Sequence, residues 1–183
     1  MSRIIDRLLS LVTFGREESA AVEEDGGVVR FNEGLDAPKT IKSTDIVSFA
    51  FEISFVATVF DDKSELEGRI YKMSASLEGG RVKARLEWRD RFGSREKSEY
   101  ETDGSFMERL QRIISDYNLA QHNGCNHCVS GLPDMYGELL DVKYASGEAI
   151  YAYNNQEGFL SMDAITEFIH TFCASNKDPF GRG

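Results

Sequence analysis

The feature that most constrains the fold is the apolar stretch from Asp45 to Phe60, DIVSFAFEISFVATVF. Its odd-numbered positions from 47 to 59 are all apolar, whereas its even-numbered positions include Ser48, Glu52, Ser54 and Thr58. Because side chains alternate between the two faces of a strand, this pattern predicts a strand with one buried face and one partly wet face. The stretch is longer than an ordinary strand, so we expect a bulge or a strong bend within it.

Two more strands, residues 69–77 and 82–90, are predicted around Gly79-Gly80, a pair that suits the type I′ turn of a hairpin. Counting outward from this turn pairs Leu77, Ala75, Met73 and Tyr71 with Val82, Ala84, Leu86 and Trp88 on one face. The other face pairs Ser76, Ser74, Lys72 and Ile70 with Lys83, Arg85, Glu87 and Arg89. Because a slip of one residue would mix the apolar and polar sets, the register is well specified. Residues 95–102 predict a weaker, charged strand that suits a sheet edge.

Two helices and a second hairpin follow. Ser105 and Glu108 have the spacing of a capping box at the start of one helix, and Ser161 is expected to cap the last helix. Residues 138–144 and 149–153 predict a hairpin around Ser146-Gly147. Strands and helices do not alternate, which argues against a doubly wound parallel sheet. The predicted class is α+β, an antiparallel sheet of a meander plus a hairpin with helices packed on one face as a two-layer sandwich.

The chain divides into unequal parts. Residues 1–15 predict an amphipathic helix, 16–27 an acidic flexible linker, 28–176 a single α+β domain and 177–183 a flexible tail. Three roles are open for the first helix. It could pack on its own domain or on a sister subunit, lie on a membrane surface through its arginines, or dock in the groove of a partner.

Composition limits the partners and the compartment. The 183 residues carry a formal net charge of −10, which disfavours non-specific binding to nucleic acid and anionic lipid. No signal peptide and no apolar run long enough to cross a bilayer are visible. The 3 cysteines are an odd number, unlike most disulfide frameworks, so we expect a cytoplasmic protein with reduced thiols.

The cysteines and histidines gather in two places. His122, Cys125, His127 and Cys128 lie in a long loop, and His170 and Cys173 lie on the last helix. A tetrahedral metal could be held by Cys125, Cys128, His170 and Cys173, but a single Cys-x-x-Cys is a weak signal. We therefore expect no metal and no cofactor. A redox pair is also disfavoured, because no strong helix follows Cys128 to stabilise a thiolate.

One basic row stands out in this acidic chain. Arg81, Lys83, Arg85 and Arg89 recur along one strand, where RNA could lie. The aromatic residues needed for base stacking, Tyr71 and Trp88, fall on the opposite, core side of the hairpin. Neutralisation by Glu78 and Glu87 across the strands is the simpler interpretation, and we expect no nucleic-acid partner.

No catalytic motif is recognisable, and no pair of carboxylates has a spacing that requires acid–base chemistry. Our leading hypothesis is a non-catalytic interaction module that binds a protein partner or itself, with residues 1–15 as one route to self-association. One alternative is an enzyme or small-ligand protein with its site in the loop of residues 119–136, since long loops are often functional. Another is an acidic immunity-type or inhibitor protein that caps a basic partner.

Overall fold

The computed structural model describes residues 21–25, 28–33, 36–54, 69–90, 92–130 and 137–173, with side chains from residue 36 onward except at Ser130. The predicted helix of residues 1–15, the end of the long central stretch (55–60) and the tail of residues 177–183 lie outside the described residues. Residues 21–25, inside the range predicted as a linker, form a strand.

The described chain contains nine strands and two α-helices. The strands are β1 (Ala21–Asp25), β2 (Val28–Glu33), β3 (Ile46–Ser54), β4 (Arg69–Glu78), β5 (Arg81–Asp90), β6 (Arg95–Thr102), β7 (Asn126–Ser130), β8 (Gly137–Tyr144) and β9 (Ala149–Asn154). The helices are α2 (Ser105–Asp116) and α3 (Met162–Cys173), with a 3₁₀ turn, η1 (Leu119–His122), after α2.

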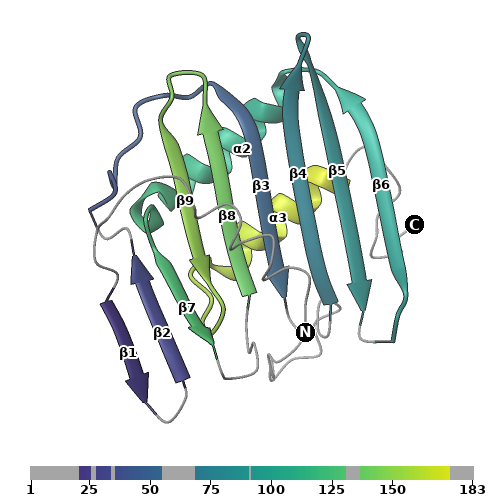
Figure 1. Cartoon of the computed structure of the whole chain (residues 1–183). Coiled ribbons are helices and arrows are strands. Elements are labelled where there is room, and N and C mark those ends of the chain that lie inside the picture. Colours follow the sequence, from purple (N-terminus) through teal and green to yellow (C-terminus); the bar gives the residue numbers. More distant parts are fainter. Residues whose placement is uncertain are drawn as a thin grey trace.

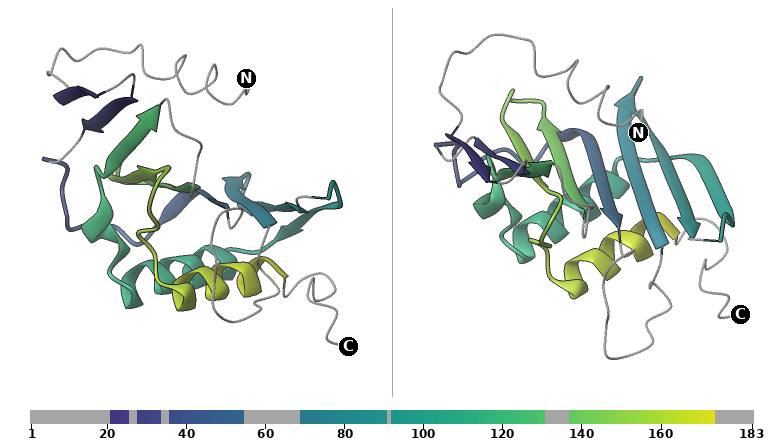
Figure 2. Two further views of the ribbon diagram at one scale, coloured as in Figure 1. Left: turned by 90° about the horizontal axis from the view of Figure 1, so that it is seen from below. Right: turned by 60° about the horizontal axis from the view of Figure 1, so that its bottom comes forward.

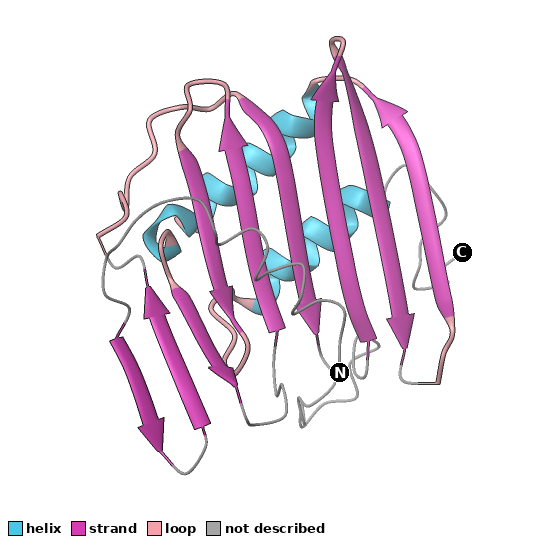
Figure 3. Ribbon diagram, viewed as in Figure 1, coloured by secondary structure: helices cyan, strands magenta, loops and turns pink. Residues whose placement is uncertain are grey.

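All nine strands join one sheet in the order β1-β2-β7-β9-β8-β3-β4-β5-β6 (Figure 1). Each neighbouring pair of these strands is antiparallel except β7 with β9, which run parallel. Both α-helices lie along the same face of the sheet (Figures 2 and 3). The α+β class with an antiparallel sheet and helices is therefore confirmed.

The central strand β3 lies between β4 and β8. Phe49, Phe51 and Ile53 are buried toward the helices, as the period of two predicts. The pairing of β3 with β8 shifts register between Ile46 and Ser48, which is an irregularity of the kind expected for this long stretch.

The hairpin of β4 and β5 has the register predicted from its turn. Leu86 pairs with Met73 and Arg85 pairs with Ser74, and the same frame holds from Glu78–Arg81 to Arg69–Asp90. Gly79 and Gly80 have φ angles of +57° and +81°, which a type I′ turn requires and which glycine adopts without a steric penalty. Local sequence thus sets the most regular part of the sheet.

Aromatic rings join the two helices to the sheet. Phe168 of α3 lies 5.0 Å from Phe49 and 5.4 Å from Phe51, measured between ring centroids. Phe172 packs edge-on against Phe106 of α2 at 5.0 Å. Such tilted and edge-to-face pairs are the favoured geometries of aromatic contacts. The core therefore lies between the helices and strands β3, β4, β5, β8 and β9.

The two helix starts differ from each other. The backbone N–H of Ala164 donates to the Ser161 hydroxyl at 3.3 Å, so the predicted cap of α3 is confirmed. The predicted capping box of α2 is wrong, because Gly104 occupies the cap position and no side chain caps it. Instead the Asp103 carboxylate, two residues before Ser105, accepts the Ser105 N–H at 2.9 Å and satisfies one free donor.

The loop of residues 119–136 is more ordered than predicted. It begins with η1 and continues into β7, which pairs with β2 on one side and β9 on the other. The sequence of β7, NHCVS, has no apolar alternation, so no periodic signal marked it as a strand. Its residues 131–136 lie outside the described part of the chain.

Candidate functional site

Four polar side chains are buried in the described chain, and all lie around η1, β7, β8 and β9: Asn123, Glu138, Asn154 and Asn155. Buried polar groups without partners are costly, so a cluster of them indicates either a structural network or a functional site. The hydrogen-bond partners of each side chain distinguish a structural network from a functional site.

Asn123 follows η1 and connects three segments of backbone. Its amide nitrogen donates to the carbonyls of Pro38 at 2.9 Å and Ala149 at 3.1 Å. Its amide oxygen accepts the N–H of Tyr151 at 2.9 Å. The Lys39 ammonium donates to the Asn123 backbone carbonyl. Every polar atom of this side chain is used to hold the chain together, which is a structural role.

Asn155 extends the short parallel pairing of β7 with β9. Its side-chain oxygen accepts the Val129 N–H at 2.9 Å, and its side-chain nitrogen donates to the Val129 carbonyl at 2.8 Å. The Asn155 side-chain amide thereby bonds to Val129 in the way that the backbone N–H and C=O of a further β9 residue would. Asn154 accepts the N–H groups of Gln156 and Glu157 at 2.9 and 3.0 Å and forms the turn that leaves β9.

Glu138 is the chemical exception in this cluster. It is fully buried on the helix-facing side of β8, where it pairs with Ile53 and Asn154. Its Oε2 accepts the N–H groups of Phe159 and Leu160 at 2.5 and 2.9 Å, which fixes the segment before α3. Its Oε1 is buried and has no hydrogen-bond partner among the described residues.

Burial raises the pKa of Glu138 from 4.5 to about 7, although the two backbone hydrogen bonds favour the charged form. Sequence reasoning missed this residue. The signal was present, because Leu140, Val142 and Tyr144 share its face by the period of two, so position 138 also points to the core.

His122 lies near this carboxylate through Phe159, and Cys125 follows three residues later in the chain. The His122 ring is 5.4 Å from the ring of Phe159, whose N–H binds Glu138. Burial lowers the pKa of His122, and the nearby Lys39 ammonium lowers it further. Burial also raises the pKa of the Cys125 thiol. A raised pKa leaves less of a thiol as the reactive thiolate, which disfavours nucleophilic or redox use of Cys125.

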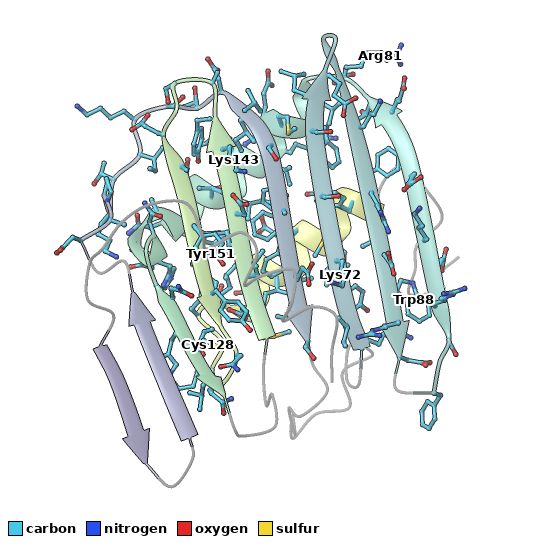
Figure 4. All side chains as sticks on the ribbon, viewed as in Figure 1. Lys72, Arg81, Trp88, Cys128, Lys143 and Tyr151 are labelled. Carbon is cyan, nitrogen blue, oxygen red and sulfur yellow. The ribbon has the colours of Figure 1, made fainter. Side chains whose placement is uncertain are left out.

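The four candidate metal ligands lie in two separate places. Cys125 directly precedes β7 and Cys128 is its middle residue (Cys128 is labelled in Figure 4), whereas His170 and Cys173 lie at the end of α3. That end of α3 lies beside β6, since the Tyr100 hydroxyl donates to the Phe172 carbonyl at 2.9 Å. Five strands separate β7 from β6 in the sheet. The described part of the chain holds no group of three or more His, Cys, Asp or Glu side chains that could bind a metal ion.

Most of the basic row of β5 forms ion pairs with carboxylates. Lys83 pairs with Glu78 of β4 at 2.6 Å, as predicted across the strands, whereas Arg85 pairs at 2.6 Å with Glu87 of β5 itself and not across the strands. Two more pairs involve β6: Arg81–Glu101 at 3.3 Å and Arg85–Glu99 at 3.7 Å. The hydrogen bond from Lys83 is the largest cause that lowers the pKa of Glu78. Arg81, Lys83 and Arg85 of this row therefore belong to a network of exposed ion pairs.

The face of the sheet away from α2 and α3, here called the distal face, has a different character over β9, β8 and β3. Cross-strand pairing places Tyr151, Asp141, Ala50 and Ser74 in one row that continues to Arg85. Figure 4 shows Tyr151, Lys143 and Lys72 on this face, in front of the helices. None of the described helices or strands packs on it.

Asp141 is the charged member of this row and is only partly exposed. Within the described part of the chain, its ion-pair partner is the Lys143 ammonium, at the long distance of 3.9 Å. Burial raises the pKa of Asp141, and Lys143 opposes this effect. The described residues thus compensate this carboxylate weakly, and a cation brought by a partner would stabilise it.

Comparison of the chain with protein-family models, with curated proteins and with solved structures found no match. No described helix is both long and apolar enough to cross a membrane.

Proposed function

We propose that this chain is a non-catalytic interaction module that binds a basic protein segment on the distal face of its sheet, around Asp141. The observation that carries the proposal is the partly exposed carboxylate of Asp141, which lies in one row with the short side chains of Ala50 and Ser74 and has Lys143 as an ion-pair partner at the long distance of 3.9 Å. Opposite charge across an interface guides partner choice.

The polar groups around η1, β7 and β9 support a non-catalytic role. The side chains of Asn123, Asn154 and Asn155 form hydrogen bonds with backbone groups of their own chain. A catalytic acid or base must instead be within hydrogen-bond reach of a substrate. The raised pKa of the Cys125 thiol argues in the same direction.

A pair of matched substitutions tests the proposal in pull-downs from native lysate. Asp141→Asn removes the charge on the distal face, whereas Asp116→Asn removes a charge of the same kind from the exposed side of α2. A partner that binds wild type and Asp116→Asn, is lost with Asp141→Asn and binds more weakly in high salt supports the proposal. A partner retained equally by both variants would contradict it.

A second candidate function, a small-ligand or enzyme site next to residues 119–136, is favoured by one atom, the buried and unpartnered Oε1 of Glu138. A buried acceptor atom without a hydrogen-bond donor is rare in native proteins, and a bound ligand that donates a hydrogen bond would account for it. A small molecule that raises the melting temperature of wild type but not of Glu138→Gln would favour this candidate.

A third candidate, an immunity-type or inhibitor protein, shares the basic partner of the main proposal. An inhibitor of a basic enzyme would need an acidic patch. On β4, β5 and β6 the acidic side chains of the distal face form ion pairs with basic ones, so these strands do not provide such a patch. This candidate would be favoured if the captured partner were a basic enzyme whose activity falls in the complex.

A further inference from the structure

Strand β6 ends the sheet and has the features of a pairing edge. No described strand lies beyond it. It runs for 8 residues, and its pairing with β5 shows no shift of register and hence no bulge. Natural edge strands are commonly protected by bulges, proline, shortness or charged side chains, and β6 has the last of these alone, so the order of its charges decides what can pair with it.

The direction of its backbone groups follows from one hydrogen bond. The Asp90 N–H donates to the Ser94 carbonyl at 2.9 Å, so residues 90 and 94 form a hydrogen-bonded pair. Hydrogen-bonded and non-hydrogen-bonded pairs alternate along antiparallel strands. The even-numbered residues of β6 therefore bond to β5, whereas the odd-numbered residues direct their N–H and C=O groups away from the sheet.

The same odd-numbered residues carry charges in a self-complementary order. They are Arg95, Lys97, Glu99 and Glu101, and all four are exposed. A second β6 laid antiparallel about Ser98 sets Arg95 opposite Glu101 and Lys97 opposite Glu99, each pair occurring twice by symmetry. A shift by two residues in either direction would instead set Lys97 opposite Lys97 or Glu99 opposite Glu99, which is destabilising.

A second observation fits the same register. Phe92, in the turn before β6, is 81% exposed and is one of two large apolar side chains exposed in the described chain. Continuing the alignment places Phe92 beside Gly104 of the second copy, where a side-chain atom would meet open space. The loop of one copy thus has room next to the start of α2 in the other.

We propose that two copies of this chain associate by antiparallel pairing of β6 with β6 about Ser98, which joins their sheets into one. This inference goes beyond the proposed function, since it concerns the β6 edge of the sheet, which β3, β4 and β5 separate from the strand of Asp141. The backbone supplies hydrogen bonds, and the charge order selects the register. An interface built on one strand edge falls below the roughly 1,200 Å² of stable complexes, so exchange between monomer and dimer over about 10 µM to about 1 mM is expected.

The test is sedimentation equilibrium of the full chain at about 0.15 M salt, with two charge variants. The acidic-edge variant, Arg95→Glu with Lys97→Glu, and the basic-edge variant, Glu99→Lys with Glu101→Lys, should each lose dimerisation at least about tenfold, because favourable cross-strand pairs become repulsive. An equimolar mixture of the two should recover it, since every pair across the edge is again opposite in sign. Thermal melts confirm that each variant is folded.

Net charge alone does not explain this pattern. The basic-edge variant changes the formal charge from −10 to −6, because each Glu→Lys exchange adds two positive charges. Weaker general repulsion would favour its self-association, whereas the proposed edge predicts that association is lost. The variant with all four charges exchanged keeps the net charge of −10 and should dimerise with itself but not with wild type.

Lys97→Pro tests the backbone pairing separately. The N–H of residue 97 points away from β5, so proline is compatible with the folded monomer but removes an outward donor. This variant should also weaken dimerisation. Wild type that remains monomeric up to about 1 mM, or a dimer that persists unchanged in both charge variants, would overturn the proposal.

Discussion

Replacing Glu138 with Gln should remove most of the dependence of stability on pH between about pH 4.5 and about pH 7. The carboxyl is fully buried, its Oε2 binds two backbone N–H groups, and its Oε1 has no partner. Ionisation leaves a charge in this apolar setting, whereas Gln has the same shape and no charge.

The sign and the size follow from the pKa of Glu138. It is about 7 in the folded protein, against 4.5 for an ordinary glutamate. Between these values the folded state binds more protons than the unfolded state, so stability falls as pH rises. At 1.36 kcal/mol per pH unit the full loss is about 3 kcal/mol. It is absent below about pH 4.5 and complete above about pH 7. A typical domain has only about 5–15 kcal/mol in total.

The assay is urea unfolding of wild type and Glu138→Gln at several values of pH from about 4.5 to about 8.5. The free energy of unfolding of wild type should fall by about 3 kcal/mol relative to the variant across this range. The amide nitrogen that replaces Oε1 has no acceptor and adds a cost of about 1–3 kcal/mol that does not vary with pH, so only the slope is diagnostic.

An exposed carboxyl provides the control. Glu78 has a pKa below 4.5, lowered by its hydrogen bond from Lys83, so Glu78→Gln should not change the slope above pH 4.5. If the curves of wild type and Glu138→Gln are parallel, the carboxyl of Glu138 does not titrate in this range. The described burial would then be wrong.

Three further outcomes are expected. Leu86→Asp should unfold the domain, because it removes a buried leucine and buries a carboxylate at a combined cost of several kcal/mol. Arg85→Asp, which changes an exposed ion pair, should cost about 1 kcal/mol or less. Thermal melts of the two variants test this difference. Gly147→Ala should cost about 1 kcal/mol, because φ is +88° there, while Gly104→Ala, with open space and an ordinary φ, should cost little. Removal of residues 1–27 should leave a cooperative melting transition, since among the described strands β1 pairs with β2 alone, at the sheet edge.

Local sequence alone determined much of the sheet and both helices. The register of β4 with β5 followed from Gly79-Gly80 and from the alternation of apolar residues on each side. The edge position of β6 followed from its charges, and the cap of α3 from Ser161. These features depend on the period of side chains and on turn geometry, both of which are properties of short segments.

Tertiary structure decided the features that depend on neighbours distant in the chain. Strand β7 forms because β2 and β9 supply its partners, and Asn155 completes its pairing by a side chain that no periodicity reveals. The separation of Cys125 and Cys128 from Cys173 was likewise fixed by the strand order. The raised pKa of Glu138 arises only when α3 and the sheet exclude water from it, because desolvation is a property of the packed core and not of the residue.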